Sequence, residues 1–245
     1  MPPSTTDSVL VATGITKRFG ALAVLDGVSL GLSPGDAVGI VGPNGAGKTT
    51  LLNVLAGSMA PDQGTIVFRG RDITSKGAAD RCNLGIARTH QVPRPFGGMT
   101  VFENVLVAAT AGARKRGGEA YDLCLRVLDQ TALITHANRR AESLGLLQRK
   151  RLELARALAV DPAVLLLDEI GGGLTDAETG ALVETVSGLR DRGIAVLWIE
   201  HIVHVLMQVV GRLVCMDEGR IIAEGAPEVV VAQAAVIDAY LGGQA

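Results

Sequence analysis

The sequence predicts an α/β fold built on a largely parallel sheet. Short apolar runs alternate with helical patterns along most of the 245 residues, which is typical of strand–helix–strand units. Three of these runs, at residues 36–42, 163–168 and 194–200, have the length and apolarity of buried strands, and each leads into a turn or a helix. Hydrophobic residues make up 48% of the chain, which is enough to bury a core and argues against intrinsic disorder.

The first part of the chain also predicts antiparallel strands. Residues 9–16 (VLVATGIT) and 26–36 (DGVSLGLSPGD) are strand-like segments bounded by turn residues, as is the later segment 64–73 (GTIVFRGRDI). We expect them to form an antiparallel β subdomain. Near the other end, residues 212–225 (RLVCMDEGRIIAEG) predict a strand pair, which leads to a final helix ending in VIDAYLG.

A helical segment interrupts this pattern from about residue 89 to residue 147. The breaker-rich loop PRPFGGMT precedes two stretches with helical periodicity, MTVFENVLVAATAGARKR and EAYDLCLRVLDQTAL. We therefore expect one domain over residues 1–245. In it, a helical subdomain at about 89–151 is inserted between core and β-subdomain segments at about 1–88 and 152–245.

Charge and cysteine content narrow the class of protein. The formal net charge of −2 gives no general reason to expect nucleic acid as a partner. The three cysteines are widely spaced and form no CxxC pair, which indicates a reducing compartment. The stretch MPPSTTDSVLV has no signal-peptide pattern, and no apolar run approaches the ~20 residues that cross a bilayer. We expect a cytoplasmic chain that can still dock onto a membrane protein.

The stretch GPNGAGKTT carries the strongest functional signal. It fits the pattern G-x-x-x-x-G-K-[ST], with an apolar strand before it and a helical stretch after it. Its glycines let consecutive N–H groups surround an anion at a helix N-terminus, while Lys48 can reach the β- and γ-phosphates and the Thr49 hydroxyl can bind Mg²⁺. The sequence thus predicts a P-loop NTPase (RecA-like) core. Its nucleotide contacts are Gly42, Pro43, Asn44, Gly45, Ala46, Gly47, Lys48, Thr49 and Thr50.

Polar side chains follow the other two buried strands. Asp168 and Glu169 end the run LLLDE, where Asp168 can hold Mg²⁺, directly or through water, and Glu169 can polarise the attacking water as general base. His201 follows the third strand and can hydrogen-bond a γ-phosphate, although a lone histidine there is more often structural. We expect Lys48, Glu169 and His201 to be the catalytic residues.

These parts, in this order, resemble the ATP-binding subunit of an ABC transporter over nearly the whole chain. The resemblance implies ATP and Mg²⁺ as cofactors. Gln91, in RTHQVPRPF, matches the family's glutamine loop, which contacts Mg²⁺ and relays the nucleotide state to the membrane subunits, so the implied Mg²⁺ ligands are Thr49, Gln91 and Asp168. Phe19, in TKRFGAL, matches the aromatic residue that stacks on adenine, although alone it would more often belong to the core.

Within that superfamily the chain is most similar to the ATPases of high-affinity uptake systems for branched-chain amino acids and amides. The similarity lies in ARTHQVPRPFGGMTVFENVLVA, KRLELARAL, DEIGGGLTDAE, IEH and VIDAYLG. It implies an importer with two different ATPases, transmembrane permease subunits and a periplasmic solute-binding protein. The chain would then lie on the inner face of the plasma membrane, held by the permease. An ATPase for another small solute, such as urea or an amide, is the alternative.

The chain departs from the family in the signature loop, which binds the γ-phosphate of ATP held by the opposite subunit. The family reads Leu-Ser-Gly-Gly-Gln, and the residues here are Leu144, Gly145, Leu146, Leu147 and Gln148. The serine hydroxyl is missing, and the Leu147 side chain would obstruct the approach of the backbone to phosphate. Three cations follow at 149–151, near the positive end of the helix dipole, and a phosphate in front of the helix would explain them.

A second departure follows Glu169. Ile170 stands in place of the usual proline and precedes three glycines, which we expect to make the loop flexible. Thr175 replaces the usual Asp or Asn that contacts the partner subunit. We therefore expect an asymmetric heterodimer. This chain's phosphate loop with a partner's intact signature loop would hydrolyse ATP, and the site that relies on residues 144–148 would turn over slowly.

Other classes of protein fit less well. A GTPase would need an Asn-Lys-x-Asp base reader, which the sequence lacks. A nucleotide-dependent regulatory module with little hydrolysis fits the altered signature loop, but Glu169 and His201 argue against a pure binder. A soluble ABC protein of DNA repair or translation would usually carry tandem cassettes, a coiled coil or basic extensions, none of which is evident in the sequence.

Overall fold

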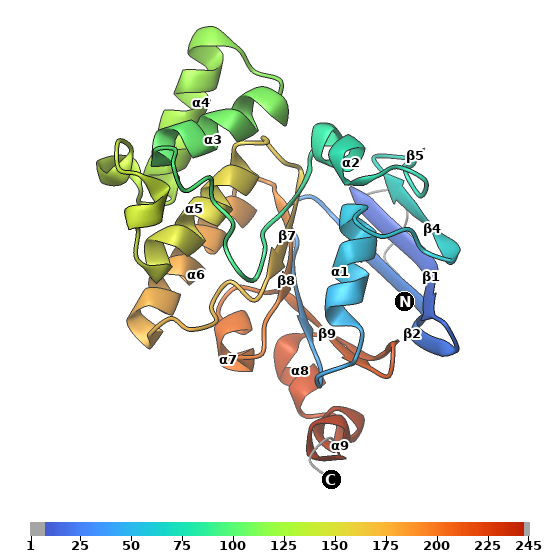
Figure 1. The fold of residues 1–245 in the computed structure, drawn as a ribbon. Coiled ribbons are helices and arrows are strands. Elements are labelled where there is room, and N and C mark those ends of the chain that lie inside the picture. The colour runs from blue at the N-terminus through green and yellow to red at the C-terminus, as the bar shows by residue number, and fades with distance from the viewer. Residues whose placement is uncertain (1–7, 243–245) are drawn as a thin grey trace.

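The structure is a computed structural model that describes residues 8–242. The described part excludes residues 1–7 and 243–245. The expectation that the chain has no signal peptide concerns a stretch that begins with residues 1–7, so it lies partly outside the described residues. The chain forms two sheets with helices packed around them (Figure 1).

The larger sheet has six strands in the order β10–β9–β3–β8–β7–β6. They are β3 (Ala37–Val41), β6 (Ile86–Arg88), β7 (Val164–Asp168), β8 (Ala195–Ile199), β9 (Arg212–Asp217) and β10 (Arg220–Gly225). All neighbours pair in parallel except β10, which pairs antiparallel with β9. The predicted strands and the predicted terminal pair are thus confirmed, and β6 is an additional short strand at the edge.

Side chains alternate across this sheet between two apolar cores. Ala37 and Val41 of β3 belong to the core that includes α3 to α6, whereas Val38 and Ile40 belong to the core that includes α1 and the smaller sheet. Trp198 of β8, which is fully buried, faces the first core. Because both faces are covered, β3, β7 and β8 are buried along their whole length, which explains their continuous apolar runs.

The smaller sheet is antiparallel, in the order β2–β1–β4–β5, as the sequence predicts. Its strands are β1 (Leu10–Phe19), β2 (Leu22–Leu32), β4 (Gln63–Phe68) and β5 (Arg71–Asp72). Helix α1 (Lys48–Ala56) lies between the two sheets (Figure 1). The buried Arg81 of α2 (Ala78–Leu84) fixes the far end of α1, because its guanidinium donates to the carbonyl oxygens of Val54 (2.7 Å) and Leu55 (2.9 Å).

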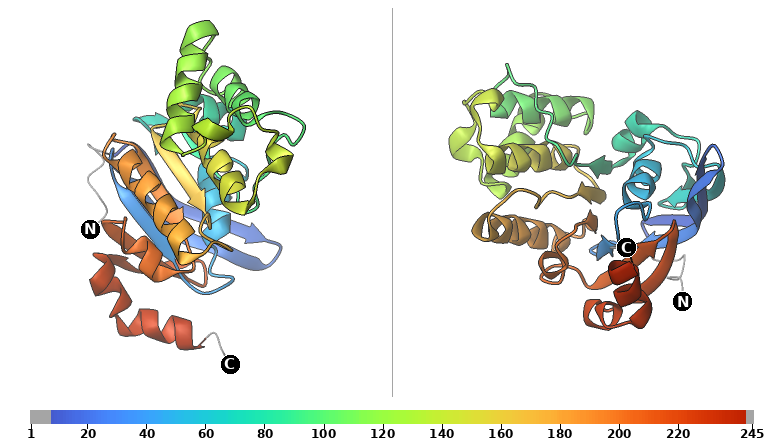
Figure 2. Two further views of the ribbon diagram at one scale, coloured as in Figure 1. Left: turned by 90° about the vertical axis from the view of Figure 1, so that its left-hand side faces the viewer. Right: turned by 60° about the horizontal axis from the view of Figure 1, so that its bottom comes forward.

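The predicted helical segment contains α3 (Val101–Ala111) and α4 (Gly117–Gln130), followed by the short 3₁₀ turns Ile134–His136 and Ala141–Ser143. A capping box between Thr100 and Glu103 starts α3. Helix α5 (Leu146–Leu158) packs against α3 and runs without a break through residues 151 and 152, where the subdomain boundary was expected. Seen from the side, α3 and α4 stand at the opposite end of the molecule from the last helices (Figure 2).

The remaining helices follow the strands of the larger sheet. They are α6 (Asp176–Arg190), α7 (Val203–Leu206), α8 (Pro227–Val231) and α9 (Ala234–Gly242), the last being the predicted final helix. Within residues 8–242, no helix combines the length and the apolar character that a membrane crossing requires.

Candidate nucleotide site

The loop between β3 and α1 carries the predicted phosphate cradle at residues 42–50. Gly42 has a φ of 144°, and a Cβ there would lie 2.0 Å from the carbonyl oxygen of Met216 on β9. Gly47 has a φ of 96°, and its Cβ would lie 2.5 Å from the carbonyl oxygen of Val24 on β2. Both positions need glycine, because any side chain would collide with the backbone of a neighbouring strand.

The first turn of α1 lines a cavity. The first hydrogen bond of the helix runs from the Leu51 amide to the Gly47 carbonyl at 2.9 Å. The amides of residues 48–50 therefore have no acceptor within the helix. The cavity measures about 190 Å³ and is lined by Val24, Asn44, Gly45, Ala46, Gly47, Lys48, Thr49, Thr50, Glu169 and His201. Unbonded amides and the positive end of a helix dipole suit an anion such as phosphate.

The Lys48 side chain is buried and folded back over its own loop. Its Nζ atom donates to the carbonyl oxygens of Gly42 (2.6 Å) and Pro43 (2.8 Å). Burial lowers the pKa of Lys48, while the nearby Glu169 carboxylate favours the charged form and opposes that shift. The ammonium is therefore held at the wall of the cavity by fixed carbonyl dipoles.

Glu169 lies at the centre of a polar cluster at the carboxyl end of β7. Its Oε1 atom lies 2.8 Å from His201 Nε2, and its Oε2 atom accepts a hydrogen bond from Gln91 Nε2. The backbone of Glu169 has a φ of 47°, a conformation that residues other than glycine seldom adopt, and its amide donates to the Ile199 carbonyl at 2.9 Å. The fold thus brings Gln91, Glu169 and His201 together from three separate parts of the chain.

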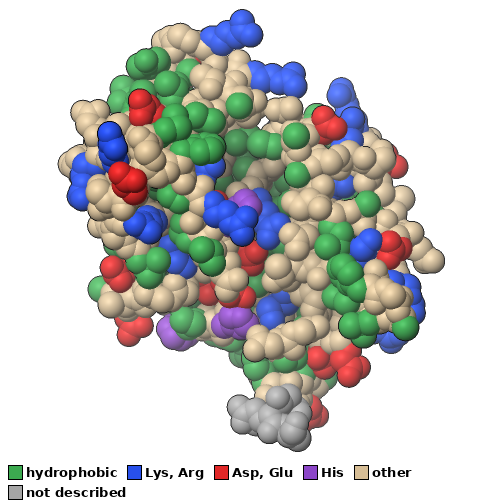
Figure 3. Space-filling view, in the orientation of Figure 1, with side chains coloured by type: hydrophobic (Ala, Val, Ile, Leu, Met, Phe, Trp, Pro, Cys, Tyr) green, Lys and Arg blue, Asp and Glu red, His purple; other side chains and the backbone are tan. Residues whose placement is uncertain are grey.

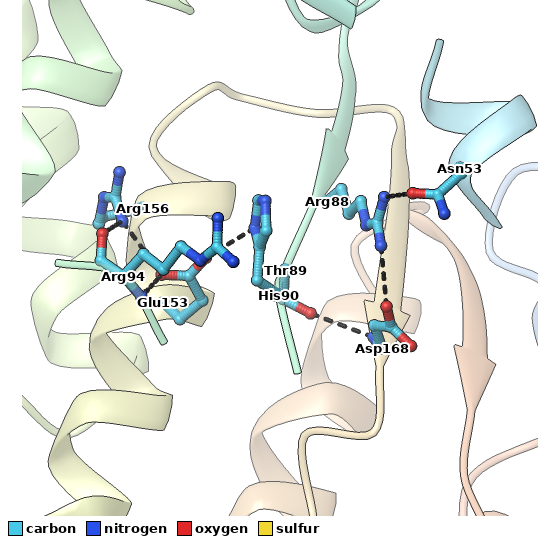
Figure 4. Close-up of polar contacts among 8 residues, drawn as sticks. All are labelled: Asn53, Arg88, Thr89, His90, Arg94, Glu153, Arg156 and Asp168. Carbon is cyan, nitrogen blue, oxygen red and sulfur yellow. Dashed lines mark hydrogen bonds and ion pairs between the residues drawn. The ribbon is translucent and has the colours of Figure 1, made fainter. Parts of the chain in front are cut away.

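Asp168, directly before Glu169, is buried and held from one side. Its Oδ2 atom accepts a hydrogen bond from Arg88 Nη2 at 2.8 Å, and its amide donates to the hydroxyl oxygen of Thr89 at 3.2 Å (Figure 4). Sequence reasoning did not assign Arg88. A lone arginine after two apolar residues has no pattern that marks it as part of a site.

The predicted magnesium ligands supply oxygen donors, which that ion prefers. Thr49, which lines the cavity, contributes a hydroxyl group, Asp168 a carboxylate and Gln91 an amide oxygen. The described residues contain no cluster of three or more His, Cys, Asp or Glu side chains that could enclose a metal by themselves. This donor set fits Mg²⁺, which usually takes one or two carboxylates together with phosphate oxygens.

Phe19 lies at the end of β1, opposite Leu22 in a tight hairpin. It is 50% exposed, so it does not belong to the core, and it is not among the residues that line the cavity. Stacking of its ring on adenine stays a prediction.

The altered signature loop overlaps the start of α5, because Gly145 is the N-cap and Leu146, Leu147 and Gln148 form the first helical turn. Leu144 is buried, Leu147 is half-buried and Leu146 is 47% exposed. Arg149, the first of the three cations, donates from Nε to the Leu144 carbonyl and from Nη2 to the Glu142 carbonyl, both at 2.8 Å. Arg149 therefore braces the backbone of its own loop, and a phosphate in front of α5 stays a prediction.

Lys150, the second of these cations, is turned inward. It is buried, and its Nζ atom donates to the Glu169 carbonyl oxygen at 3.3 Å. Burial lowers the pKa of Lys150, and the carboxylates of Glu200 and Glu169 oppose this shift. Lys150 thus links α5, which begins in the signature loop, to the backbone of the proposed catalytic glutamate.

The glycine loop after Glu169 is held in place, although its three glycines predict flexibility. The Gly171 amide donates to the buried Glu200 carboxylate at 2.6 Å, and Trp198 Nε1 donates to the same oxygen at 3.2 Å. Burial raises the pKa of Glu200, and these two hydrogen bonds oppose the shift by favouring the carboxylate. After the loop, Thr175 caps α6 in a capping box with Glu178.

The last helix reaches the phosphate loop. The Gly42 amide donates to the hydroxyl oxygen of Tyr240 at 2.9 Å, and Figure 1 shows α8 and α9 at the end of the molecule where β3 turns into α1. Burial raises the pKa of Tyr240. The sequence shows the ending VIDAYLG but gives no signal that its tyrosine meets the first residue of the cradle, because the two lie 198 positions apart.

Comparisons with known proteins agree with this geometry. The chain matches the family model of the ABC transporter over residues 25–171 and that of the branched-chain amino acid ATP-binding cassette transporter over residues 220–245. It is 36% identical to the high-affinity branched-chain amino acid transport ATP-binding protein LivG of Escherichia coli (strain K12), over 96% of this chain and 98% of that protein. It is 35% identical to the high-affinity branched-chain amino acid transport ATP-binding protein BraF of Pseudomonas aeruginosa, over 96% of this chain and 98% of that protein.

Solved structures show the same relationship. An ATP-binding cassette of an ABC transporter in its ADP conformation superposes with a TM-score of 0.88 at 33% identity, covering 97% of this chain and 100% of that one. A nucleotide-free cassette gives a TM-score of 0.86 at 32% identity, covering 95% of this chain and 98% of that one. The expected P-loop fold class is confirmed. The chain therefore belongs to the ABC transporter ATPases, in the family of branched-chain amino acid ATP-binding cassettes.

Proposed function

We propose that this chain hydrolyses ATP to power an importer of branched-chain or related amino acids. The cavity in which the phosphate-loop amides and Lys48 face Glu169 and His201 is the observation that carries the proposal. The amides of residues 48–50 would bind the phosphates, and Thr49, Gln91 and Asp168 would hold Mg²⁺. Bound Mg²⁺ would neutralise charge on the β- and γ-phosphate oxygens.

The contacts of each side chain suit a step of hydrolysis. Glu169, held by His201 and Gln91 on its two carboxylate oxygens, would orient the attacking water and take its proton. Lys48 and the loop amides would stabilise the negative charge of the γ-phosphoryl group during in-line attack. His201, 48% exposed and beside Glu169, would hydrogen-bond the γ-phosphate.

The permease would dock in a groove between the helical segment and the core. A cavity of about 550 Å³ lies there, with small apolar residues such as Ala56, Ala78, Ala108 and Ala111 in its wall. Figure 3 shows the hollow, with cationic and histidine side chains beside it. The buried Glu153 carboxylate accepts from Arg156 (3.0 Å) and lies 3.1 Å from His90 Nδ1 (Figure 4). His90 precedes Gln91, so the groove and the nucleotide cluster share one loop, which supports this assignment.

We propose that the partner ATPase is a different chain with an intact signature loop. In a head-to-tail sandwich, each ATP would lie between one subunit's phosphate loop and the other's signature loop. Exposed Leu146 and half-buried Leu147 would then face the partner's nucleotide with apolar branches where backbone should approach phosphate. The permease would hold both ATPases at the inner face of the plasma membrane, and a periplasmic solute-binding protein would deliver the substrate.

Restoring the signature loop is expected to activate the isolated chain. The double variant Gly145→Ser, Leu147→Gly should raise Mg-ATP turnover about 10²-fold, by analogy with the restoration of an oxyanion donor, and the rate should rise with protein concentration as dimers form. Turnover is measured against protein concentration. Gly145→Ser, Leu147→Ala is the matched control, since it keeps a Cβ at 147. Equal turnover of the native and repaired chains would show that the native loop already binds phosphate well and that the asymmetry is absent.

Uptake of labelled solutes tests the transport function. A strain of the source organism that lacks this gene should lose high-affinity uptake of leucine, isoleucine and valine, and the native gene should restore it. A gene encoding Lys48→Met should not. Loss of urea or amide uptake instead would favour the alternative substrates. Unchanged uptake of all these solutes, together with nucleotide binding, would favour a regulatory module.

A further inference from the structure

Arg88, the last residue of β6, joins the end of β7 to the side of α1. Its Nη2 atom donates to Asp168 Oδ2 at 2.8 Å, and its Nη1 atom donates to Asn53 Oδ1 (Figure 4). The side chain of Arg88 is 14% exposed and that of Asp168 is 5% exposed. One guanidinium group therefore connects three elements that are far apart in the sequence.

The α1 end of this bridge lies on the same face as Thr49. Thr49 and Asn53 are four residues apart in one helix, so they project from the same side, one turn apart. Thr49 lines the nucleotide cavity, and Thr49 and Asp168 are two of the proposed Mg²⁺ ligands. The bridge thus fixes how far the end of β7 stands from the first turns of α1, and with it the spacing of these two ligands.

The chemistry of arginine suits this task. A planar guanidinium holds two acceptors at once in a fixed fork, whereas a lysine ammonium is a single point charge on a flexible stem. With Oδ2 engaged by Arg88, the other carboxylate oxygen of Asp168 is left for a metal ion. The Asp168 amide, bonded to the Thr89 hydroxyl at 3.2 Å, fixes the backbone of the same residue.

We infer that Arg88 is a positioning residue of the metal site, which sets the spacing of Thr49 and Asp168 through Asn53 and thereby strengthens Mg²⁺ binding in the ATP complex. The inference rests on the proposed function, because it needs Mg-ATP at this site. A purely structural role, the neutralisation of a buried carboxylate, would need the ion pair but not the contact with Asn53.

Two conservative variants separate these roles. Arg88→Lys keeps the positive charge but lacks the rigid fork that fixes the spacing of the two acceptors, and Asn53→Ala keeps the ion pair but removes its anchor on α1. Mn²⁺ is titrated into the full chain with a non-hydrolysable ATP analogue, and free Mn²⁺ is followed by electron paramagnetic resonance. Each variant is expected to bind Mn²⁺ about 10-fold more weakly, the usual effect of losing a partner of a metal ligand, with unchanged affinity for the metal-free analogue.

The double variant and a matched control sharpen the test. Arg88→Lys with Asn53→Ala should bind Mn²⁺ no more weakly than either single variant, since both break the same bridge. Arg69→Lys, at an exposed arginine outside the nucleotide cavity, should bind it as the native chain does. If both single variants bind Mn²⁺ as tightly as the native chain, the inference is overturned and the proposed function stands. If the native chain with the analogue does not bind Mn²⁺, both are overturned.

Discussion

Replacing Glu169 by Gln is expected to lower ATP turnover about 10²–10⁴-fold, the usual contribution of a general base. Glutamine keeps the size of the side chain but cannot take the proton of the attacking water. In addition, one end of its amide would carry donors, facing either the Gln91 amide or His201, where the native carboxylate has an oxygen. ATP binding should be retained, because the loop amides and Lys48 are unchanged. Single-turnover hydrolysis and titration with a fluorescent ATP analogue measure the two effects separately.

Glu184→Gln is the matched control for this prediction, since Glu184 is exposed on α6 and outside the cavity. Its turnover should equal that of the native chain. If Glu169→Gln also hydrolysed ATP at the native rate, Glu169 would not be the base, and the cluster with Gln91 and His201 would have another role.

Lys48→Met is expected to weaken ATP binding about 10- to 100-fold, which corresponds to the loss of one charge-assisted contact with phosphate. Methionine fills similar space in the buried loop but has no charge and no donor. It also leaves the Gly42 and Pro43 carbonyls without the ammonium that now bonds them, so the free energy of unfolding should fall by about 1 kcal/mol. Isothermal titration with ATP and urea unfolding measure these changes.

Lys115→Met serves as the control. Lys115 lies in the loop before α4 and pairs with the exposed Glu119 in that helix. It should leave both quantities at their native values. Native ATP affinity in Lys48→Met would mean that the cradle binds nucleotide by its amides alone.

The strands that are buried on both faces are the ones that the sequence predicts best. The central strands β3, β7 and β8 are covered on both faces, so their residues are apolar without interruption and can be recognised directly. β6 was missed because three residues carry no periodicity. Its place at the edge of the sheet is set by pairing with β7, which lies about 80 residues away.

The site residues also fall into two groups, those that a local sequence pattern predicts and those that it does not. The phosphate cradle is a continuous motif, and the positions of Asp168, Glu169 and His201 follow from the ends of strands, so local patterns are sufficient for them. Arg88, Lys150 and Tyr240 act through contacts with distant segments, which no local pattern encodes. The contacts of Arg149 and Lys150 could not be foreseen for the same reason. The dipole argument was local, whereas Lys150 finds its partner in another part of the chain and Arg149 bonds the backbone of its own loop.

Strand β3 has both of its sheet neighbours, β8 and β9, in the last third of the chain. About 150 residues separate Val41 from Ala195, so at ~5–20 residues per second a ribosome needs about 10–30 s to make the first of these neighbours after β3 has been synthesised. Throughout that time the nascent chain contains an apolar strand without its partners, which is a target for aggregation and for chaperones. A chain truncated before residue 195 would therefore lack both strands that pair with β3. We expect such a chain to be degraded and not to form a smaller ATP-binding protein.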